Sequence, residues 1–355
     1  MIGERLHRAR KASGLSLRDL GSVIGISHTA VNKYEKDQLM PSSGQLIELS
    51  KALGVRAEYF LRPISVEIKG IEYRKRSNAP KALLSKITAD VYDQAERWEE
   101  LLQLYPHKPV PDFELPDSLP EKINTDADIE KISEQMRHAW ELGLNPVPDL
   151  IDTLESRGAL VILSAVDAAQ KFDGLAGEMG SKPVIVVSEN WCGDRQRFTL
   201  AHELGHLVLK GRFPQAMDEE KACNLFAGAF LLPKPAVLDV FGEHRNALDM
   251  NELHMLKEEY GLSMSGIIFR AFQCGVISEG IRKNLIIKFS KMGWRKKEPG
   301  SPYPAEKTWL FDRLVYRALA EDYIGESKAA ELFGMSLRNF RKESRLELTG
   351  AGTYQ

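Results

Sequence analysis

The stretch CGDRQRFTLAHELGHLVLKG, residues 192–211, decides the fold of the larger part of this chain. It reads as one long helix that ends at Gly211, and apolar side chains surround two histidines within it, as a buried helix requires. His202 and His206 are four residues apart, so they lie one turn apart on the same face. Both imidazoles can therefore bind one metal ion, and Glu203 lies close enough to act as a general base on a nearby water molecule.

A catalytic zinc ion needs three protein ligands and one open position, so a third ligand must come from outside this helix. The next predicted helix, residues 217–233, carries Glu219 and Glu220 near its start. The loop between the helices allows them to pack antiparallel, and the positive end of a helix dipole favours a carboxylate there. The spacing leaves both carboxylates open as the third ligand. An ordinary amphipathic helix is the alternative, but Gly205 inside the motif favours close packing around a buried site.

Short runs rich in β-branched residues precede the motif helix and predict a small sheet. The predicted elements there are two helices and three strands, at residues 126–143, 145–158, 159–166, 172–179 and 182–189. Residues 251–290 read as helical except for the strand-like run NLIIKFS at 284–290. This order of elements indicates an α+β domain.

These segments together resemble the ImmA/IrrE family of metallopeptidases over about residues 124–290. RFTLAHELGHLVL (197–209) and EEKACNLFAGAFLLP (219–233) follow the family pattern R-x-x-F-T-x-A-H-E-x-G-H, then E-x-x-A-N-x-F-A, then L-x-P. The resemblance implies a zincin-like fold that binds Zn²⁺, with Mn²⁺ also possible.

Site residues follow from this resemblance position by position. It implies His202 and His206 as the histidine ligands, Glu220 as the third ligand and Glu203 as the catalytic base. Cys223 departs from the alanine that is usual in the family, and we interpret it as a small core residue. The loop before Glu220 is short, so Glu219 stays the alternative third ligand.

Residues 1–62 predict a separate all-α bundle of four short helices. In SLRDLGSVIGISHTAVNKYEKDQLMPS (16–42), two helices flank the turn GIS, and apolar side chains pack the pair together. Polar side chains then remain on the open face of the second helix, where they can contact base edges in a major groove. These are Ser27, His28, Thr29, Asn32 and Lys33. Ten basic and six acidic residues in this segment give the positive excess that a phosphate-facing surface requires.

This bundle resembles the lambda-repressor-like (Xre/Cro type) helix-turn-helix family. The resemblance implies a structural pair between Arg10 and Glu35 and a double-stranded DNA operator as the partner. It also implies base-reading roles for His28, Thr29 and Lys33, and phosphate contacts near Arg18 and Lys36. A helical bundle used for protein contacts is the alternative.

The expected architecture is multidomain: an all-α helix-turn-helix bundle, an α+β zincin-like metallopeptidase domain and a helical C-terminal region. The expected boundaries are 1–62 for the bundle, 63–123 for a linker with a long helix, 124–290 for the metallopeptidase domain and 291–355 for the C-terminal region. A basic connector rich in proline and glycine, GWRKKEPGSPYP (293–304), opens the last part. AAELFGMSLRNF (329–340) slightly resembles a further helix-turn-helix, but a helical cap or a dimer element is the favoured interpretation.

Composition sets limits on the function. The chain has 355 residues, a net charge of −2 and a hydrophobic fraction of 43%, so bulk charge does not indicate a nucleic-acid partner. The N-terminus lacks an apolar signal sequence, and the longest apolar run, LFAGAFLL (225–232), is too short to span a membrane. Three widely separated cysteines fit a reducing compartment. We therefore expect a cytoplasmic protein without a membrane partner.

The expected function is that of a DNA-binding transcriptional regulator with a zinc-dependent endopeptidase domain. In the resembling family, members cleave a repressor to switch on stress or mobile-element genes. Because this chain carries a repressor-like domain itself, it could cleave a separate helix-turn-helix repressor or itself, and a homodimer is possible. Two alternatives remain: a transcription factor whose metal domain only senses or oligomerises, and an antitoxin-like binding module.

Overall fold

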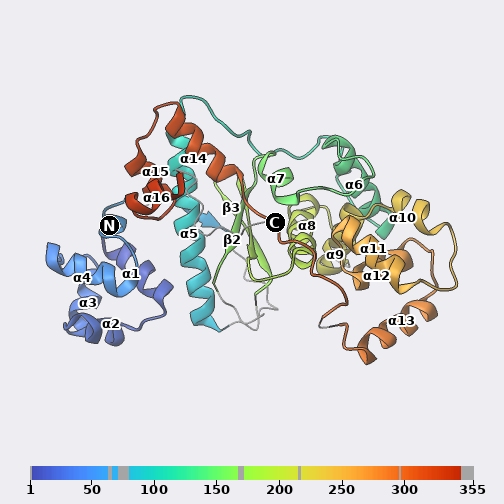
Figure 1. The fold of residues 1–355 in the computed structure, drawn as a ribbon, viewed down its shortest axis with the longest axis horizontal. Helices are drawn as coiled ribbons and strands as arrows, with labels where there is room; N and C mark the ends of the chain where they lie inside the picture. The colour runs from blue at the N-terminus through green and yellow to red at the C-terminus, as the bar shows by residue number, and fades with distance from the viewer. Residues whose placement is uncertain are drawn as a thin grey trace, which may run out of the picture. The chain divides into compact units, whose positions relative to one another are not determined.

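The computed structural model describes residues 2–62, 66–70, 80–166, 172–214, 217–295 and 297–344. The chain divides into two compact units, each built from segments that are separated in the sequence (Figure 1). The first unit contains residues 1–67, 80–111 and 308–355, and the second contains residues 68–79 and 112–307.

The N-terminal part of the first unit is a bundle of short helices. It contains α1 (Ile2–Ser13), α2 (Leu17–Ile24), α3 (His28–Glu35), α4 (Ser43–Leu53) and the 3₁₀ helix η1 (Ala57–Leu61). Ser16, Ser27 and Ser42 precede three of these helices and each accepts a hydrogen bond from a backbone N–H in the first turn, as polar N-caps do. A core that includes Leu20 and Val31 closes the bundle. The predicted all-α bundle is confirmed.

Four further helices complete the first unit: α5 (Lys81–Gln103), α14 (Leu310–Ala320), α15 (Glu326–Leu332) and α16 (Leu337–Ser344). Burial raises the pKa of Glu96 on α5, but this carboxylate is ion-paired with Arg5 and Arg8 of α1. On the same helix, Trp98 stacks on Phe311 of α14, with ring centroids 5.8 Å apart. Residues expected to form a linker and a separate C-terminal region therefore group with the N-terminal bundle.

A four-stranded sheet forms one layer of the second unit (Figure 1). Its strands are β1 (Ile68–Lys69), β2 (Leu160–Ser164), β3 (Gly174–Met179) and β4 (Lys182–Ser188). The spatial order is β1-β3-β4-β2, with β3 antiparallel to both of its neighbours and β2 parallel to β4. The three strands that the sequence predicted are confirmed, and α8 packs against β3 and β4.

The described part of the second unit also contains the motif helix and helices on both sides of it in the sequence. They are α6 (Asp126–Ala139), α7 (Leu150–Glu155), α8 (Gly193–Leu209), α9 (Glu219–Leu231), α10 (Lys234–Phe241), α11 (Met250–Tyr260), α12 (Met264–Gln273) and α13 (Glu279–Lys291). Across the described residues, no single helix is long and apolar enough to cross a membrane, and the bent pair α9 and α10, at 59°, meets that criterion only by combined length and composition.

The strand expected at 284–290 is wrong, because these residues lie in α13. Ser278 caps this helix by accepting a hydrogen bond from the N–H of Ile281. Leu285 and Phe289, four residues apart, pack on the main core, whereas Ile287 is 52% exposed. The apolar residues thus follow a helical face. Packing of that face outweighs the local β-propensity of the run.

Helices α8 and α9 approach each other closely at Gly205. A Cβ placed there would lie 3.1 Å from Cδ1 of Phe226 and 3.3 Å from Cα of Cys223. The close packing expected at this glycine is therefore present. Cys223 is fully buried at this crossing, in keeping with a small core residue.

Gly205→Ala should lower the free energy of unfolding of the second unit by about 1–2 kcal/mol, because overpacking outweighs the gain in helix propensity. Gly280→Ala on α13 is the matched control, since the nearest atom to its new Cβ is Oγ of Ser278 at 3.8 Å. That variant should stabilise the helix by up to about 1 kcal/mol. Native-state hydrogen exchange of amides in α8 and α13 compares the two variants, and equal stabilisation by both would contradict the expectation.

Candidate metal centre and nucleic-acid interface

Three metal-ligating side chains meet where α8 faces the start of α9. Nε2 of His202 lies 3.1 Å from Nε2 of His206. The Glu220 carboxylate lies 3.7 Å from the first of these nitrogens and 3.5 Å from the second. Zinc bonds of about 2.0–2.2 Å in a tetrahedral arrangement place neighbouring ligand atoms about 3.3 Å apart. The three side chains therefore fit one zinc-sized ion. Their ligand atoms all lie within 4.8 Å of one another.

The outer nitrogens of both histidines have partners that orient the rings. Nδ1 of His202 lies 2.8 Å from Oδ1 of Asn224, and Nδ1 of His206 lies 3.0 Å from Oε1 of Glu219. A proton on each Nδ1 leaves the Nε2 lone pairs facing the shared point, as in histidine metal sites generally. This geometry favours Glu220 as the direct ligand and Glu219 as the group that positions His206. No role for Asn224 was predicted from the sequence, although it stands at the asparagine of the ImmA/IrrE pattern.

The two neighbouring glutamates should therefore differ in their effect on metal affinity. Glu219→Ala should weaken Zn²⁺ binding about 10–100-fold, the usual range for a group that orients a ligand. Glu220→Ala should weaken it by more than that range, because one of three protein ligands is lost. Competition against a chromophoric chelator measures both constants. Equal losses, or a larger loss for Glu219→Ala, would reassign the ligand.

Glu203 lies where α8 meets the sheet, and its side chain is buried, at 2% exposure. Gly174 of β3 faces it: a Cβ there would lie 3.5 Å from Oε1 of Glu203 and 2.5 Å from Cγ2 of Thr199. A side chain at position 174 would collide with α8, so this glycine lets the sheet approach the helix beside the carboxylate.

A buried ion pair holds α8 in place. Arg197 on α8 is fully buried, and its Nη1 donates to Oε1 of Glu306 at 2.5 Å. Oε2 of Glu306 accepts from the backbone N–H groups of Leu150 and Ile151 at the start of α7, at 2.9 and 3.1 Å. Burial raises the pKa of the Glu306 carboxyl, and the Arg197 guanidinium opposes that shift. One carboxylate thus joins the motif helix to α7.

A second carboxylate, which precedes Glu306 in the sequence, anchors the same stretch of chain. Glu298 accepts from the backbone N–H groups of Met264 and Ser265 at the start of α12, at 2.9 and 3.0 Å, and from Nζ of Lys257 at 3.0 Å. Residues 297–307, which the sequence analysis placed in a connector and C-terminal region, therefore group with the second unit.

In the first unit, α2 and α3 are joined by a tight turn. Gly25 has a φ of 72°, and the N–H of Ile26 donates to the carbonyl oxygen of Gly21 at 2.9 Å. A Cβ on Gly21 would lie 2.7 Å from the carbonyl oxygen of Ile26, so only glycine fits this fold-back. Ser27 then caps α3 by accepting from the N–H of Ala30 at 3.1 Å. This is a helix-turn-helix geometry.

The residues predicted to contact DNA lie on the surface of this motif. Six are exposed, namely Arg18, Ser27, His28, Thr29, Lys33 and Lys36, and Asn32 is half-buried. The hydroxyl of Ser27 already accepts the capping bond, and its O–H and second lone pair remain for a ligand.

Arg10 on α1 and Glu35 on α3 form the expected pair. It is bidentate, with N–O distances of 2.5 and 2.9 Å. Burial acts to raise the pKa of Glu35, but hydrogen bonds from Arg10 and His7 outweigh it and hold this pKa below its ordinary value. The pair therefore stabilises the bundle at neutral pH, and its contribution is lost as the pH falls through the lowered pKa.

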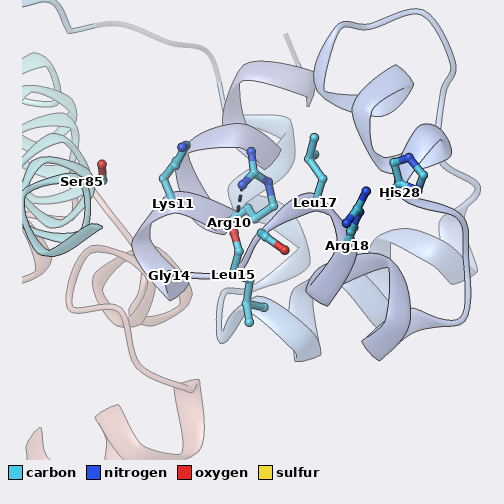
Figure 2. A pocket seen from close by; sticks show the side chains of 9 residues that line it. Arg10, Lys11, Gly14, Leu15, Leu17, Arg18, His28 and Ser85 are labelled. Carbon is cyan, nitrogen blue, oxygen red and sulfur yellow. Dashed lines mark hydrogen bonds between the residues drawn. The ribbon is translucent and has the colours of Figure 1, made fainter. Parts of the chain in front are cut away.

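A cleft of about 610 Å³ opens beside the start of α3. Figure 2 shows Arg18 and His28 close together on one side of it, with Lys11 and Ser85 on the other. Three of these four side chains are basic or can become so, and they come from α1, α2 and α3. Such a rim suits the phosphate backbone of a duplex.

Two family models match the chain. Residues 6–60 match a helix-turn-helix model, and residues 155–272 match that of the IrrE N-terminal-like domain. The chain carries both of these domains. The second match spans the metal-ligand cluster, Glu203 and strands β2, β3 and β4, so the resemblance to the ImmA/IrrE family is confirmed.

Each of three curated relatives is similar to part of the chain. Over 83 residues the chain is 36% identical to the radiation response metalloprotease IrrE of Deinococcus radiodurans, covering 18% of this chain and 25% of that protein. It is 35% identical over 77 residues to the uncharacterized HTH-type transcriptional regulator y4wC of Sinorhizobium fredii, covering 22% and 53%. It is 28% identical over 108 residues to repressor protein C2 of Salmonella phage P22, covering 30% and 47%. The chain spans about half the length of the y4wC and C2 proteins that it matches.

Proposed function

We propose that this protein is a DNA-binding transcriptional regulator whose IrrE-like domain is a zinc-dependent endopeptidase. The observation that carries the proposal is the convergence of His202, His206 and Glu220 beside the buried Glu203. The same chain exposes a helix-turn-helix surface on α3. Similarity to a metalloprotease and to HTH-type regulators supports both halves of the proposal.

Each side chain of the metal centre then has a defined task. His202, His206 and Glu220 hold the ion, while Asn224 and Glu219 keep the two rings oriented. The metal, Zn²⁺ or alternatively Mn²⁺, supplies Lewis-acid polarisation of the scissile carbonyl when bound. Glu203 takes a proton from the attacking water and passes it to the leaving amine. Burial of Glu203 keeps bulk solvent away from this carboxylate and strengthens its electrostatic effect.

The proposed substrate is a separate helix-turn-helix repressor or related regulator. This proposal follows from the resemblance to the ImmA/IrrE family, whose members cleave repressors to start a stress or mobile-element response. The chain's own helix-turn-helix domain makes self-cleavage the second form of the same reaction.

A cleavage assay tests the proposal. The purified full chain, loaded with Zn²⁺ or Mn²⁺, is incubated with helix-turn-helix products of neighbouring genes, and intact masses are followed over time. A substrate split into two fragments, with cleavage stopped by a chelator, supports the endopeptidase, and fragments of the chain itself show self-cleavage. Chelation that changes DNA binding or oligomeric mass without cleavage supports the sensing alternative. A co-purifying partner that stays intact supports a binding module.

DNA recognition through α3 has its own test. Lys33→Ala and Thr29→Ala should each weaken binding to a duplex selected from a random pool, by about 1–3 kcal/mol where the side chain contacts a base. Lys51→Ala on α4 removes an exposed charge, at 68% exposure, from another helix and is the control. A dimer is the form expected to read two half-sites. Unchanged affinity in both α3 variants would exclude this face.

A further inference from the structure

The C-terminal helices α15 and α16 are joined by a turn with specific geometry. Gly334 has a φ of 69°, and the N–H of Met335 donates to the carbonyl oxygen of Ala330 at 2.9 Å. Ser336 then caps α16, because its Oγ accepts from the N–H of Asn339 at 3.2 Å. Glycine in the left-handed region, an apolar residue and a serine cap follow one another in that order.

The turn between α2 and α3 is built in the same way. Gly25, Ile26 and Ser27 occupy the same three places, with a left-handed glycine at a φ of 72°. The backbone bond from Ile26 to Gly21 spans five residues and measures 2.9 Å, as does the bond from Met335 to Ala330. In both helix pairs the acceptor of this bond is a small residue of the first helix, Gly21 in α2 and Ala330 in α15. The two turns therefore share residue types, hydrogen bonds and backbone conformation.

A third helix completes a small core around α15 and α16. Val315 and Ala318 of α14 are fully buried, and so are Ala329 and Leu332 of α15. Phe340 of α16, at 1% exposure, takes the place that Val31 has in α3. Helices α14, α15 and α16 thus form a three-helix arrangement in which the last helix packs through one face only.

The outer face of α16 is polar and basic. Its exposed residues are Arg338, Asn339, Arg341, Lys342, Glu343 and Ser344. Arg341 pairs with Glu326 of α15 at 2.7 Å, which fixes α16 on α15. Arg338, Asn339 and Lys342 point to a polyanionic ligand, because these side-chain types contact phosphates and base edges. A dimer element would instead present apolar side chains, and those exposed on the described part of α16 are all polar.

We propose that α14–α16 form a second helix-turn-helix that contacts double-stranded DNA through α16. Arg338 and Lys342, four residues apart, lie on one face of α16 and contact the phosphate backbone, and the exposed Asn339 lies beside them. The proposed function needs only the α2–α3 motif for DNA binding, so this inference extends the DNA contact to a further surface. It adds a DNA contact to helices that also pack on α5, where the sequence alone favoured a helical cap or a dimer element.

The test compares two double variants of the full chain. Arg338→Ala with Lys342→Ala removes two charges from α16, and Lys288→Ala with Lys291→Ala removes two exposed charges from α13. Binding to a fluorescent random-sequence duplex of about 40 base pairs, long enough for several helical turns, is measured over a series of salt concentrations. The α16 variant should lower the slope of log affinity against log salt by about two, and the control by none.

Footprinting on a selected duplex gives an independent readout. The α16 variant should protect a shorter stretch than the wild-type chain, while Lys33→Ala should weaken protection at the other end. Circular dichroism confirms folding. If the double variant does not fold, Lys342→Gln alone should lower the salt slope by about one. Unchanged slope and footprint would overturn the proposal, as would a change in oligomeric mass without a change in slope.

Discussion

Glu203→Gln should abolish peptide cleavage while leaving the metal in place. Glutamine has nearly the same size and keeps the packing of this buried side chain against β3, but its amide cannot accept the proton of the attacking water. Loss of a general base lowers kcat by about 10²–10⁴-fold. Because Glu203 is not among the three side chains that converge on the ion, Zn²⁺ affinity should stay near its wild-type value.

Two further variants serve as controls for this prediction. Glu178→Gln on β3 changes an exposed glutamate, at 46% exposure, in the same unit and should leave cleavage unchanged. His206→Ala should lose both metal and activity. The metal content is measured by native mass spectrometry and the rate by intact-mass analysis of the substrate. Cleavage that persists in Glu203→Gln would disprove the assigned base, and loss of metal in that variant would make the carboxylate structural.

Arg197→Ala should have the largest effect on stability. The substitution leaves the buried Glu306 carboxylate without the guanidinium that neutralises it, and breaking such a pair costs about 3–5 kcal/mol. Arg195→Ala is the matched control on the same helix, because its pair with Asp173 is exposed, at 43% and 49%. Surface pairs of this kind contribute at most about 1 kcal/mol.

Native-state hydrogen exchange is the measurement suited to this comparison, since the chain has two units and one global unfolding midpoint would mix them. In Arg197→Ala the opening free energy of α8 amides should fall by about 3–5 kcal/mol. In Arg195→Ala it should stay near the wild-type value. Zn²⁺ affinity should fall in parallel, because both histidines lie on α8. Equal protection in the two variants would show that the Arg197–Glu306 pair does not hold the helix.

The sequence predicted those features that local spacing determines. Two histidines four residues apart identify a shared helical face wherever the helix packs, so His202 and His206 could be found without a fold. The α2–α3 turn could be predicted too, because Gly25 and Ser27 mark the end of one helix and the start of the next. The three strands around residues 160–188 were marked by β-branched runs between turn residues.

Other features depend on contacts between distant parts of the chain. Glu306 meets Arg197 across 109 residues of sequence, and nothing near either residue signals the other. The grouping of α5 with α14–α16 rests on pairs such as Trp98 with Phe311, which appear only after folding. The role of Asn224 needed the crossing of α8 and α9. For α13, local β-propensity pointed to a strand, and burial of Phe289 and its neighbours on one face decided otherwise.

The first unit is built from segments that lie far apart in the sequence, and this has a consequence for biosynthesis. On the ribosome, α1–α5 emerge early, but their partners α14–α16 emerge only after the whole second unit has been made. Until then Trp98 lacks Phe311, and Glu100 lacks the ammonium group of Lys328, 228 residues downstream. Since domains generally fold as they leave the ribosome, N-terminal parts first, the second unit can be complete while the first is still unfinished. The two units would then mature at different times.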